Sequence, residues 1–379
     1  MKKILVVTGT RADYGIYYPL LNTIRNEGAY QLELLVTGMH LSPEFGNTID
    51  EIRRDKFSIV ATVDNLLQGS NHANMAKSIG LAILGMTQAF ESSQPDFVVV
   101  LGDRGEMLAA TIAATHLNIP VVHFHGGEVS GTIDESVRHA ISKLSHIHMV
   151  ATEGSKQRLL QMGEDSWRIH VVGAPRIETI QKTALPSFKE VKRKYGLNIN
   201  EYYLFVYHPV TTETSKLAKE MDDIFNVLLE SKENIICILP NSDAGQDIIN
   251  SYYSKLRGHE KLYFIKNFNQ LDYLTVLKNA KALIGNSSSG IIEAASFKIP
   301  VINIGTRQYG RERSKNTIDV NADYNEVKEA LKRIKSSDFI NVVRNTENVY
   351  GKGNTSEKFL RIIKNIQVNK ELIQKSITY

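Results

Sequence analysis

Cysteine is nearly absent from this sequence, and long apolar runs are absent altogether. Cys237 is the single cysteine among 379 residues, which excludes a disulfide framework, a cysteine-ligated zinc site and an iron–sulfur cluster, and is typical of a reducing compartment. No apolar run approaches the ~18 residues that a membrane-spanning helix needs. The apolar N-terminal stretch stops at residues 8–11, too early for a signal peptide. We therefore expect a cytoplasmic protein without a membrane partner.

The charge balance is nearly even. Lysine and arginine total 45 against 41 acidic residues, and the resulting formal charge of +4 is too small to favour nucleic acid as a partner. The 42% hydrophobic and 23% charged fractions are typical of a globular protein that buries a sizeable core. At ~100–200 residues per domain, the length predicts two domains, or at most three.

Short runs rich in Val and Ile alternate with amphipathic stretches along the first half of the chain. Apolar residues at helical spacing predict helices over 16–24 and 76–90. Such alternation is typical of a parallel sheet covered on both faces. The runs that we predict as strands are 4–7, 32–36, 57–62, 96–101, 120–124, 146–151 and 169–172.

The alternation pauses at the breaker 173–175 and across the charged, poorly periodic stretch 187–200, and then it restarts. The predicted strands of this second part are 202–207, 234–239, 261–265, 282–284 and 300–304. We predict two doubly wound, Rossmann-like α/β domains, 1–175 and 176–355. A helical segment of about 356–379 follows and is able to pack back on the first domain. Ligand sites of such sheets lie at the carboxyl ends of their strands.

Residues 8–15 follow the first predicted strand and open the first helix, but they lack the dinucleotide-binding pattern G-x-G-x-x-G. A nicotinamide-dependent enzyme is therefore not expected. Arg11 lies in this turn, where a helix N-terminus favours anions. Its side chain is equally suited to bind a phosphate or to form a salt bridge with Asp13.

Asp103 follows the predicted strand 96–101 after one glycine, at the start of a helix. An aspartate at this place commonly caps the helix. It is also a candidate acid, base or acceptor for a sugar hydroxyl, because strand ends line ligand clefts.

Residues 123–139 form the segment richest in titratable side chains, and its paired glycines let the backbone approach a ligand. His125, Glu128 and Asp134 are candidates for acid–base catalysis. Arg138 follows Asp134 by four residues, so we expect both on one side of a helix. A structural polar cluster and a metal site are the alternatives, although the H-E-x-x-H spacing of a helical metal site is absent.

Polar segments also follow three predicted strands of the second domain. Residues 285–293 contain three consecutive serines at a helix start, a pattern suited to a pyrophosphate or to a simple serine cap. The lysine of a Walker A loop is missing, which argues against a P-loop NTPase. Arg307 follows the next strand and adds positive charge. His208 ends the first strand, as a phosphate partner, a proton donor or a structural histidine.

Taken in order, these motifs resemble the hydrolysing UDP-N-acetylglucosamine 2-epimerase family of sialic-acid and related nonulosonate biosynthesis. The resemblance implies a glycosyltransferase-B type fold of two Rossmann-like domains, with the active site in the interdomain cleft. The segments that carry it are 9–15, 37–40, 102–104, 126–128, 132–139, 208–211, 285–288 and 305–308, together with Glu293.

The resemblance also implies roles for individual residues. The implied catalytic residues are Asp103, His125, Glu128, Asp134 and His208. The implied substrate- and UDP-binding residues are Arg11, Arg104, Arg138, His208, Asn241, Ser287, Ser288, Ser289, Gly290, Glu293 and Arg307. The pyrophosphate is expected at 287–290 and Arg307, and the ribose at Glu293. The implied partner is a UDP-sugar, with no metal or other cofactor, and we expect a homodimer or homotetramer.

The implied reaction eliminates UDP from UDP-N-acetylglucosamine and hydrates the resulting 2-acetamidoglucal to free N-acetylmannosamine. Family members often carry Glu at the position of His125, and this departure raises UDP-2,4-diacetamido-2,4,6-trideoxyhexose as an alternative substrate. The rival functions are a UDP-sugar glycosyltransferase, a non-catalytic sugar-nucleotide sensor and a non-hydrolysing epimerase. The acid cluster favours an epimerase. Arg11-Ala12-Asp13 favours the hydrolysing branch, since non-hydrolysing relatives usually carry Arg-Pro-Glu there.

Overall fold

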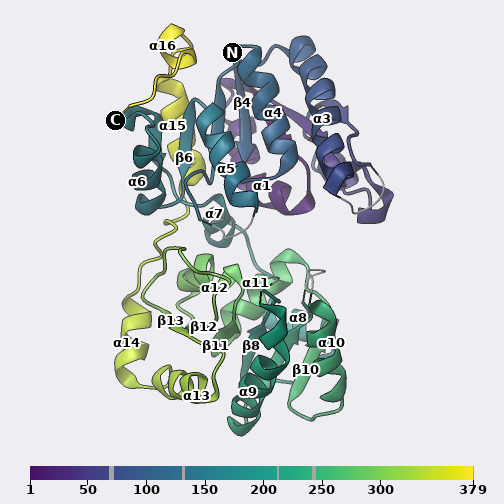
Figure 1. Ribbon diagram of the computed structural model, residues 1–379, viewed down its shortest axis with the longest axis vertical. Helices are drawn as coiled ribbons and strands as arrows, with labels where there is room; N and C mark the ends of the chain where they lie inside the picture. Colours follow the sequence, from purple (N-terminus) through teal and green to yellow (C-terminus); the bar gives the residue numbers. More distant parts are fainter. Residues whose placement is uncertain (68–71, 130–132, 211–212, 241–244, 379) are drawn as a thin grey trace. The chain divides into compact units, whose positions relative to one another are not determined.

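The computed structural model describes residues 1–67, 72–129, 133–210, 213–240 and 245–378, and it divides into two compact units (Figure 1). Unit 1 comprises Met1–Lys182 and Tyr350–Tyr379, and unit 2 comprises Thr183–Val349. Unit 1 therefore also contains residues 176–182 of helix α7 (Pro175–Lys182) and residues 350–355, which were predicted to belong to the second domain. Each unit is an α/β layer structure around one parallel sheet, as predicted.

The sheet of unit 1 has seven parallel strands in the order β3-β2-β1-β4-β5-β6-β7. All seven strands predicted for this part of the chain are present. Their bounds are β1 (Lys2–Thr8), β2 (Tyr30–Thr37), β3 (Ile59–Val63), β4 (Phe97–Leu101), β5 (Val121–Phe124), β6 (Ile147–Val150) and β7 (Ile169–Val171). Strand order reverses between β1 and β4, which is the topological switch point where such sheets bind ligands.

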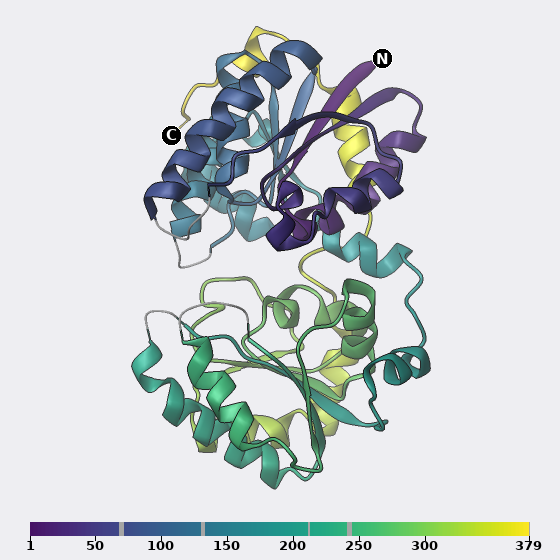
Figure 2. The ribbon, with the colours of Figure 1, turned by 90° about the vertical axis from the view of Figure 1, so that its right-hand side faces the viewer.

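Alternate residues of each central strand face opposite cores, because successive side chains of a strand point to opposite faces. Ile4 and Val6 of β1 are buried in one core, and Leu5 and Val7 in the other. Figure 2 shows blue helices on one face of this sheet and purple and yellow helices on the other. The helices of unit 1 are α1 (Arg11–Asn26), α2 (Ile49–Arg54), α3 (His72–Ser93), α4 (Gly105–His116), α5 (Ile133–Leu144), α6 (Glu153–Gln161), α7, α15 (Thr355–Asn365) and α16 (Lys370–Ile373).

The end of the chain returns to unit 1. Helix α15 packs against α1 and α7, and its Phe359 and Ile363 are buried in the core that Ile4 and Val6 share. The predicted helical segment of about 356–379 is only partly realised, because α15 ends at Asn365 and α16 spans four residues. Lys2 Nζ donates to the carbonyl oxygens of Ile363 and Ile366 and so satisfies the end of α15.

The sheet of unit 2 has six parallel strands in the order β10-β9-β8-β11-β12-β13. Their bounds are β8 (Tyr202–Val206), β9 (Asn234–Ile238), β10 (Leu262–Ile265), β11 (Ala282–Gly285), β12 (Val301–Ile304) and β13 (Thr317–Val320). The five predicted strands are confirmed. Strand β13 was not predicted, because this short edge strand contains an exposed Asp319 and lacks a continuous apolar run.

The helices of unit 2 are α8 (Phe188–Tyr195), α9 (Leu217–Glu230), α10 (Gln246–Lys255), α11 (Gln270–Asn279), α12 (Ser288–Ile292), α13 (Tyr324–Arg333) and α14 (Ser337–Asn345). Helix α8 lies in the stretch that looks poorly periodic in sequence, and Ser187 and Glu190 form its capping box. Within the part of the chain that the structure describes, no helix is long and apolar enough to cross a membrane.

Candidate active site

The turn after β1 is held together by Asp13. Its buried carboxylate accepts hydrogen bonds from the hydroxyl of Thr8 and from the backbone N–H groups of Gly9 and Thr10. Burial raises the pKa of Asp13 to about 6 despite these hydrogen bonds. Arg11 points elsewhere, because its guanidinium pairs with Glu51 at 3.0 Å on the surface. The expected salt bridge between Arg11 and Asp13 is therefore wrong, and phosphate binding by Arg11 stays a prediction.

Asp103 does not cap helix α4, so the capping interpretation of this residue is wrong. Arg104 occupies the N-cap position without a side-chain capping bond, and Asp103 instead forms an ion pair with Arg138 of α5. Burial raises the pKa of Asp103, Arg138 opposes that rise, and the charges of Asp134 and Glu128 add to it. Arg138 also binds the backbone of Glu128, and Asp134 lies one turn before Arg138 on α5, so the three predicted carboxylates belong to segments that meet around this arginine.

His125 and Glu128 form a pair in the loop after β5. His125 Nδ1 lies 2.6 Å from Glu128 Oε1, and both side chains are mostly buried. His125 Nε2 is buried and has no hydrogen-bond partner among the described residues. The loop requires glycine at position 127, where φ is +71° and a Cβ would lie 2.3 Å from the carbonyl oxygen of Ser155.

Helix α5 presents Asp134 and Arg138 in different environments, although they are one turn apart. Asp134 is exposed, whereas Arg138 is 4% exposed and donates from Nη1 to the carbonyl oxygen of Glu128 at 3.0 Å. The buried guanidinium therefore connects Asp103 to the loop that contains Glu128. This placement favours a supporting role for Arg138 over the predicted contact with substrate.

Glu106 joins this site without having been predicted. It is buried in the first turn of α4, pairs with Arg104 at 3.1 Å, and lies against the turns that contain Gly9 and Gly38. The only sequence signal for it is an acidic residue at a helix start beyond a strand end.

A cavity of about 790 Å³ opens beside the cluster. Its polar wall includes Asp134, Arg104 and Glu106, and its apolar wall includes Phe45, Leu66, Leu67, Met75 and Ile79. Such a mixture of apolar walls and a few charged groups is typical of small-molecule sites.

In unit 2, the serine-rich segment follows β11 as predicted. Ser287 caps α12, its hydroxyl accepting from the N–H of Ser289 at 3.3 Å, so the capping interpretation is confirmed. Ser289 Oγ is hydrogen-bonded to Tyr273 and lies 2.9 Å from Ser287 Oγ. Gly285 has φ +131°, and a Cβ there would lie 2.1 Å from the carbonyl oxygen of Val206, so only glycine fits. Pyrophosphate binding by Ser287, Ser288, Ser289 and Gly290 stays a prediction.

Asn286, which was not predicted as a site residue, forms hydrogen bonds that connect three strand ends of unit 2. Its side chain exchanges two hydrogen bonds with the backbone of His208, at 2.8 and 2.7 Å, and its carbonyl oxygen accepts from Arg307 Nη1 at 3.2 Å. Because β8, β11 and β12 are neighbours, His208, the serine segment and Arg307 gather at the carboxyl edge of the sheet. Glu293 is buried just beyond α12, and Asn241 lies outside the described residues.

No group of three or more His, Cys, Asp and Glu side chains among the described residues could hold a metal ion. The polar atoms of both strand-end sites are oxygens and nitrogens of carboxylates, imidazoles, serines and arginines. Such groups supply acid–base chemistry and anion binding.

Comparisons with known proteins agree with this arrangement. A family model described as UDP-N-acetylglucosamine 2-epimerase matches residues 22–364. The chain is 44% identical over 380 residues to UDP-N,N'-diacetylbacillosamine 2-epimerase (hydrolyzing) of Legionella pneumophila, covering 100% of both chains. It is 38% identical to a UDP-N-acetylglucosamine 2-epimerase of Neisseria meningitidis serogroup B, over 88% of this chain and 87% of that protein.

The fold is also found in solved structures. The structure of UDP-GlcNAc 2-epimerase from Neisseria meningitidis bound to UDP-GlcNAc superposes with a TM-score of 0.79, at 19% identity, over 96% of this chain and 100% of that chain. With the family model matching most of the sequence, the chain belongs to the UDP-N-acetylglucosamine 2-epimerase family.

Proposed function

We propose that this protein is a hydrolysing 2-epimerase, which converts a UDP-linked 2-acetamido sugar into UDP and the free sugar epimerised at C2. The observation that carries the proposal is the cluster of Asp103, Glu128 and Asp134 with His125, beside a cavity suited to a small ligand. Full-length identity of 44% to a relative whose name specifies the hydrolysing reaction supports the same assignment.

The chemistry requires a base near C2 and stabilisation of the leaving UDP. In the first step a base takes the C2 proton, the C–H electrons form the C1–C2 double bond, and the C1–O electrons leave with UDP. In the second step water adds its oxygen to C1, and a proton returns to C2 on the opposite face. Two proton-transfer groups and an anion site are therefore needed.

We assign acceptance of the C2 proton to His125, whose buried Nε2 must be uncovered when substrate binds. When Nδ1–H donates to Glu128, Nε2 carries the lone pair, and the carboxylate stabilises the imidazolium that forms. Asp103 is suited to the opposite proton transfer, because burial raises its pKa and lets it carry a proton more readily than an exposed aspartate. Asp134, at the rim of the cavity, is placed to orient the sugar.

We assign UDP to the strand-end residues of unit 2. The pyrophosphate is held by Arg307 and by 287–290, where hydroxyl and backbone N–H donors begin α12. Glu293 accepts from the ribose hydroxyls. Arg11, His208 and Asn241 complete the set, and His208 is also able to protonate the departing phosphate.

A 2,4-diacetamido-2,4,6-trideoxy sugar is the second candidate substrate. The Legionella relative is named for UDP-N,N'-diacetylbacillosamine, and the cavity has an apolar wall that suits the C6 methyl group and the methyl of the 4-acetamido group. UDP-N-acetylglucosamine would instead present hydroxyls at C4 and C6 to that wall. Relative kcat/KM values of the purified protein on the two substrates distinguish them.

The reaction is tested by incubating the protein with each substrate in D2O and, separately, in water enriched in heavy oxygen. Elimination and hydration place deuterium at C2 and heavy oxygen at C1 of a free sugar, with UDP released. A non-hydrolysing epimerase gives deuterium at C2 while the sugar stays on UDP, and a glycosyltransferase gives neither label without an acceptor. Free sugar that retains protium at C2 would mean plain hydrolysis and would overturn the proposal.

A further inference from the structure

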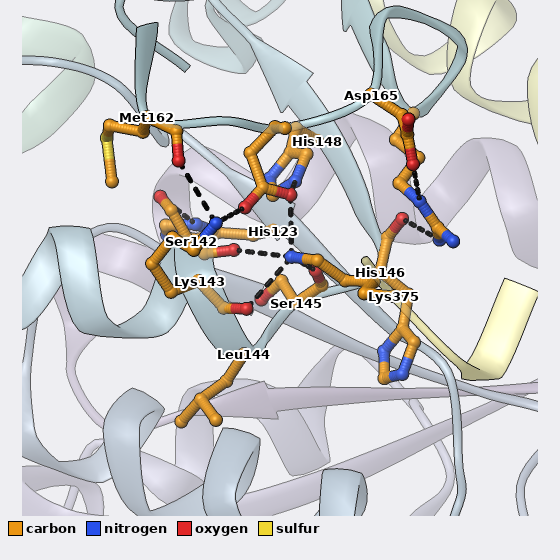
Figure 3. Close-up of polar contacts among 12 residues, drawn as sticks. His123, Ser142, Lys143, Leu144, Ser145, His146, His148, Met162, Asp165 and Lys375 are labelled. Atoms are coloured by element: carbon orange, nitrogen blue, oxygen red, sulfur yellow. Dashed lines mark hydrogen bonds and ion pairs between the residues drawn. The ribbon is translucent and has the colours of Figure 1, made fainter. Parts of the chain in front are cut away.

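Lys375, near the end of the chain, binds the C-terminal end of helix α5. Its Nζ donates to the carbonyl oxygens of Ser142, Lys143 and Ser145, at 3.3, 2.9 and 2.6 Å. Figure 3 shows these carbonyl groups converging on the ammonium. The last carbonyls of a helix lack intrahelical partners and carry partial negative charge, so a cation is well placed there.

The charge of Lys375 is balanced inside unit 1. Glu164 Oε2 lies 2.6 Å from its Nζ, and the same carboxylate contacts Lys143 at 2.7 Å and His148 at 3.0 Å. These partners lower the pKa of Glu164 to about 2 in spite of its burial. Burial lowers the pKa of Lys375 to about 8, although Glu164 opposes the change. The charged and titratable groups facing Lys375 are Glu164, Lys143, Arg168, His146 and His148.

The segment that carries Lys375 is anchored by other residues as well. Arg168 donates to the carbonyl oxygens of Leu372 and Glu371, at 2.9 and 2.7 Å. The N–H of Thr378 donates to the carbonyl oxygen of Gly163 at 3.0 Å. These bonds do not involve α5, so they hold the C-terminal segment in place independently of that helix. Lys375 then connects the anchored segment to the end of α5.

Helix α5 in turn supports the carboxylate cluster. Arg138 pairs with Asp103 and binds the carbonyl oxygen of Glu128. One turn further along the helix, Ser142 Oγ lies 3.2 Å from Nδ1 of His123, and Nε2 of that histidine lies 2.8 Å from the carbonyl oxygen of Gly102. Two successive turns of α5 thus reach the loop that contains Asp103.

We propose that Lys375 is a positioning residue of the active site, which fixes helix α5 along its axis and thereby holds Arg138 against Asp103. The inference rests on the proposed function, since it assigns a purpose to the position of the acid cluster. Lys375 touches no reacting atom in this scheme. Its effect passes through α5, because a small shift of that helix lengthens the ion pair on which the protonation of Asp103 depends.

The test compares Lys375→Met with Lys2→Met. Lys2 is a matched control, because its Nζ binds the C-terminal carbonyls of α15 in the same unit, and that helix carries none of the predicted site residues. We expect Lys375→Met to lower kcat at least tenfold while KM changes less than threefold. Loss of the support from Arg138 raises the pKa of Asp103 further. Because Asp103 acts in its protonated form in this scheme, the alkaline limb of the kcat–pH profile moves to higher pH. Lys2→Met lowers stability and leaves that profile unchanged.

Hydrogen exchange supplies a readout that needs no turnover. In Lys375→Met the amides at 141–146 should lose protection, whereas in Lys2→Met the loss should fall at 363–367. Lys375→Gln keeps amide donors for the helix carbonyls, so the loss of protection and the change in the pH profile should be smaller but in the same direction. This variant is used if Lys375→Met fails to fold.

A folded Lys375→Met or Lys375→Gln protein with wild-type kcat, pH profile and exchange at α5 would overturn the inference. So would equal profile shifts in Lys2→Met and Lys375→Met, because these would mean general destabilisation. A wild-type protein that releases neither UDP nor free sugar would instead overturn the proposed function, and the exchange experiment would still decide whether Lys375 holds α5.

Discussion

Arg138 of α5 forms an ion pair with Asp103 at the end of β4, although the two residues are 35 positions apart in the sequence. Arg138 is 4% exposed, and the other Nη group of its guanidinium binds the backbone of Glu128. One side chain thus fixes two of the carboxylate-bearing segments. Replacing either partner is expected to affect both folding and chemistry, which a surface carboxylate would not do.

Asp103→Asn should lower turnover at least ~100-fold, the scale of lost acid–base catalysis. Because Arg138 then loses a charged partner in a buried setting, the free energy of unfolding should also fall by about 1–3 kcal/mol. UDP release and urea denaturation measure the two effects.

Asp165→Asn is the matched control for that substitution. Asp165 pairs with Arg168, which is 2% exposed, so the change also removes a carboxylate from a buried arginine. It lies away from the carboxylate cluster, and Arg168 keeps its bonds to the carbonyl oxygens of Leu372 and Glu371, so turnover should stay near the wild-type value. Near-normal turnover in folded Asp103→Asn would show that Asp103 has no role in the chemistry.

Arg307→Ala should raise the dissociation constant of UDP at least tenfold, which corresponds to ~1.4 kcal/mol. The reason is that Arg307 extends from the end of β12 beside the hydroxyl-rich start of α12, held by the carbonyl oxygen of Asn286. Titration calorimetry measures the dissociation constant of UDP for each protein. Arg333→Ala, on α13 of the same unit, removes an arginine that stacks on Phe339 and should leave UDP affinity unchanged. Equal affinities in all three proteins would place the pyrophosphate elsewhere.

Unit 1 should lose stability in mild acid. Burial lowers the pKa values of His40 and His146 to about 4 and that of His123 to about 3, so these side chains stay neutral in the folded protein. In the unfolded chain they bind protons below pH ~6.5, which favours unfolding as the pH falls. The raised pKa values of Asp13 and Asp103 act in the opposite direction, since the folded carboxyls bind protons first.

The net effect of these groups is at least about one extra proton on the unfolded chain between pH 6 and 4, or ~1.4 kcal/mol per pH unit. Trp167, the single tryptophan, lies in unit 1 and reports its unfolding by fluorescence in urea. His123→Asn should flatten the pH dependence, whereas His116→Asn, at an exposed position, should not. A free energy of unfolding that stays constant from pH 7 to 4 would contradict the assignment of neutral buried histidines.

The strands of both sheets follow from the sequence because their signal is local. Runs such as 97–101 are apolar throughout, and a strand buried on both faces requires that pattern. Clustering of Asp103 and His125 was also predictable, since each follows a strand and parallel strands end at one edge. Strand β13 was not predicted. It lies at the edge of the sheet, where a strand need not be apolar throughout, so its sequence lacks the pattern that predicts the other strands.

The partners of the polar side chains were decided only by the tertiary structure. Asp103 looks like a helix cap in sequence and is an ion-pair partner in the fold, and Arg11 pairs with Glu51 rather than with its neighbour Asp13. Lys375 meets the end of α5 across more than 200 positions of sequence. A local pattern encodes whether a segment is buried, but a charge in a fold binds whichever groups the packing of distant segments brings within reach. The sequence therefore determined the sheets and the edges where the site lies, and packing decided which side chains support its chemistry.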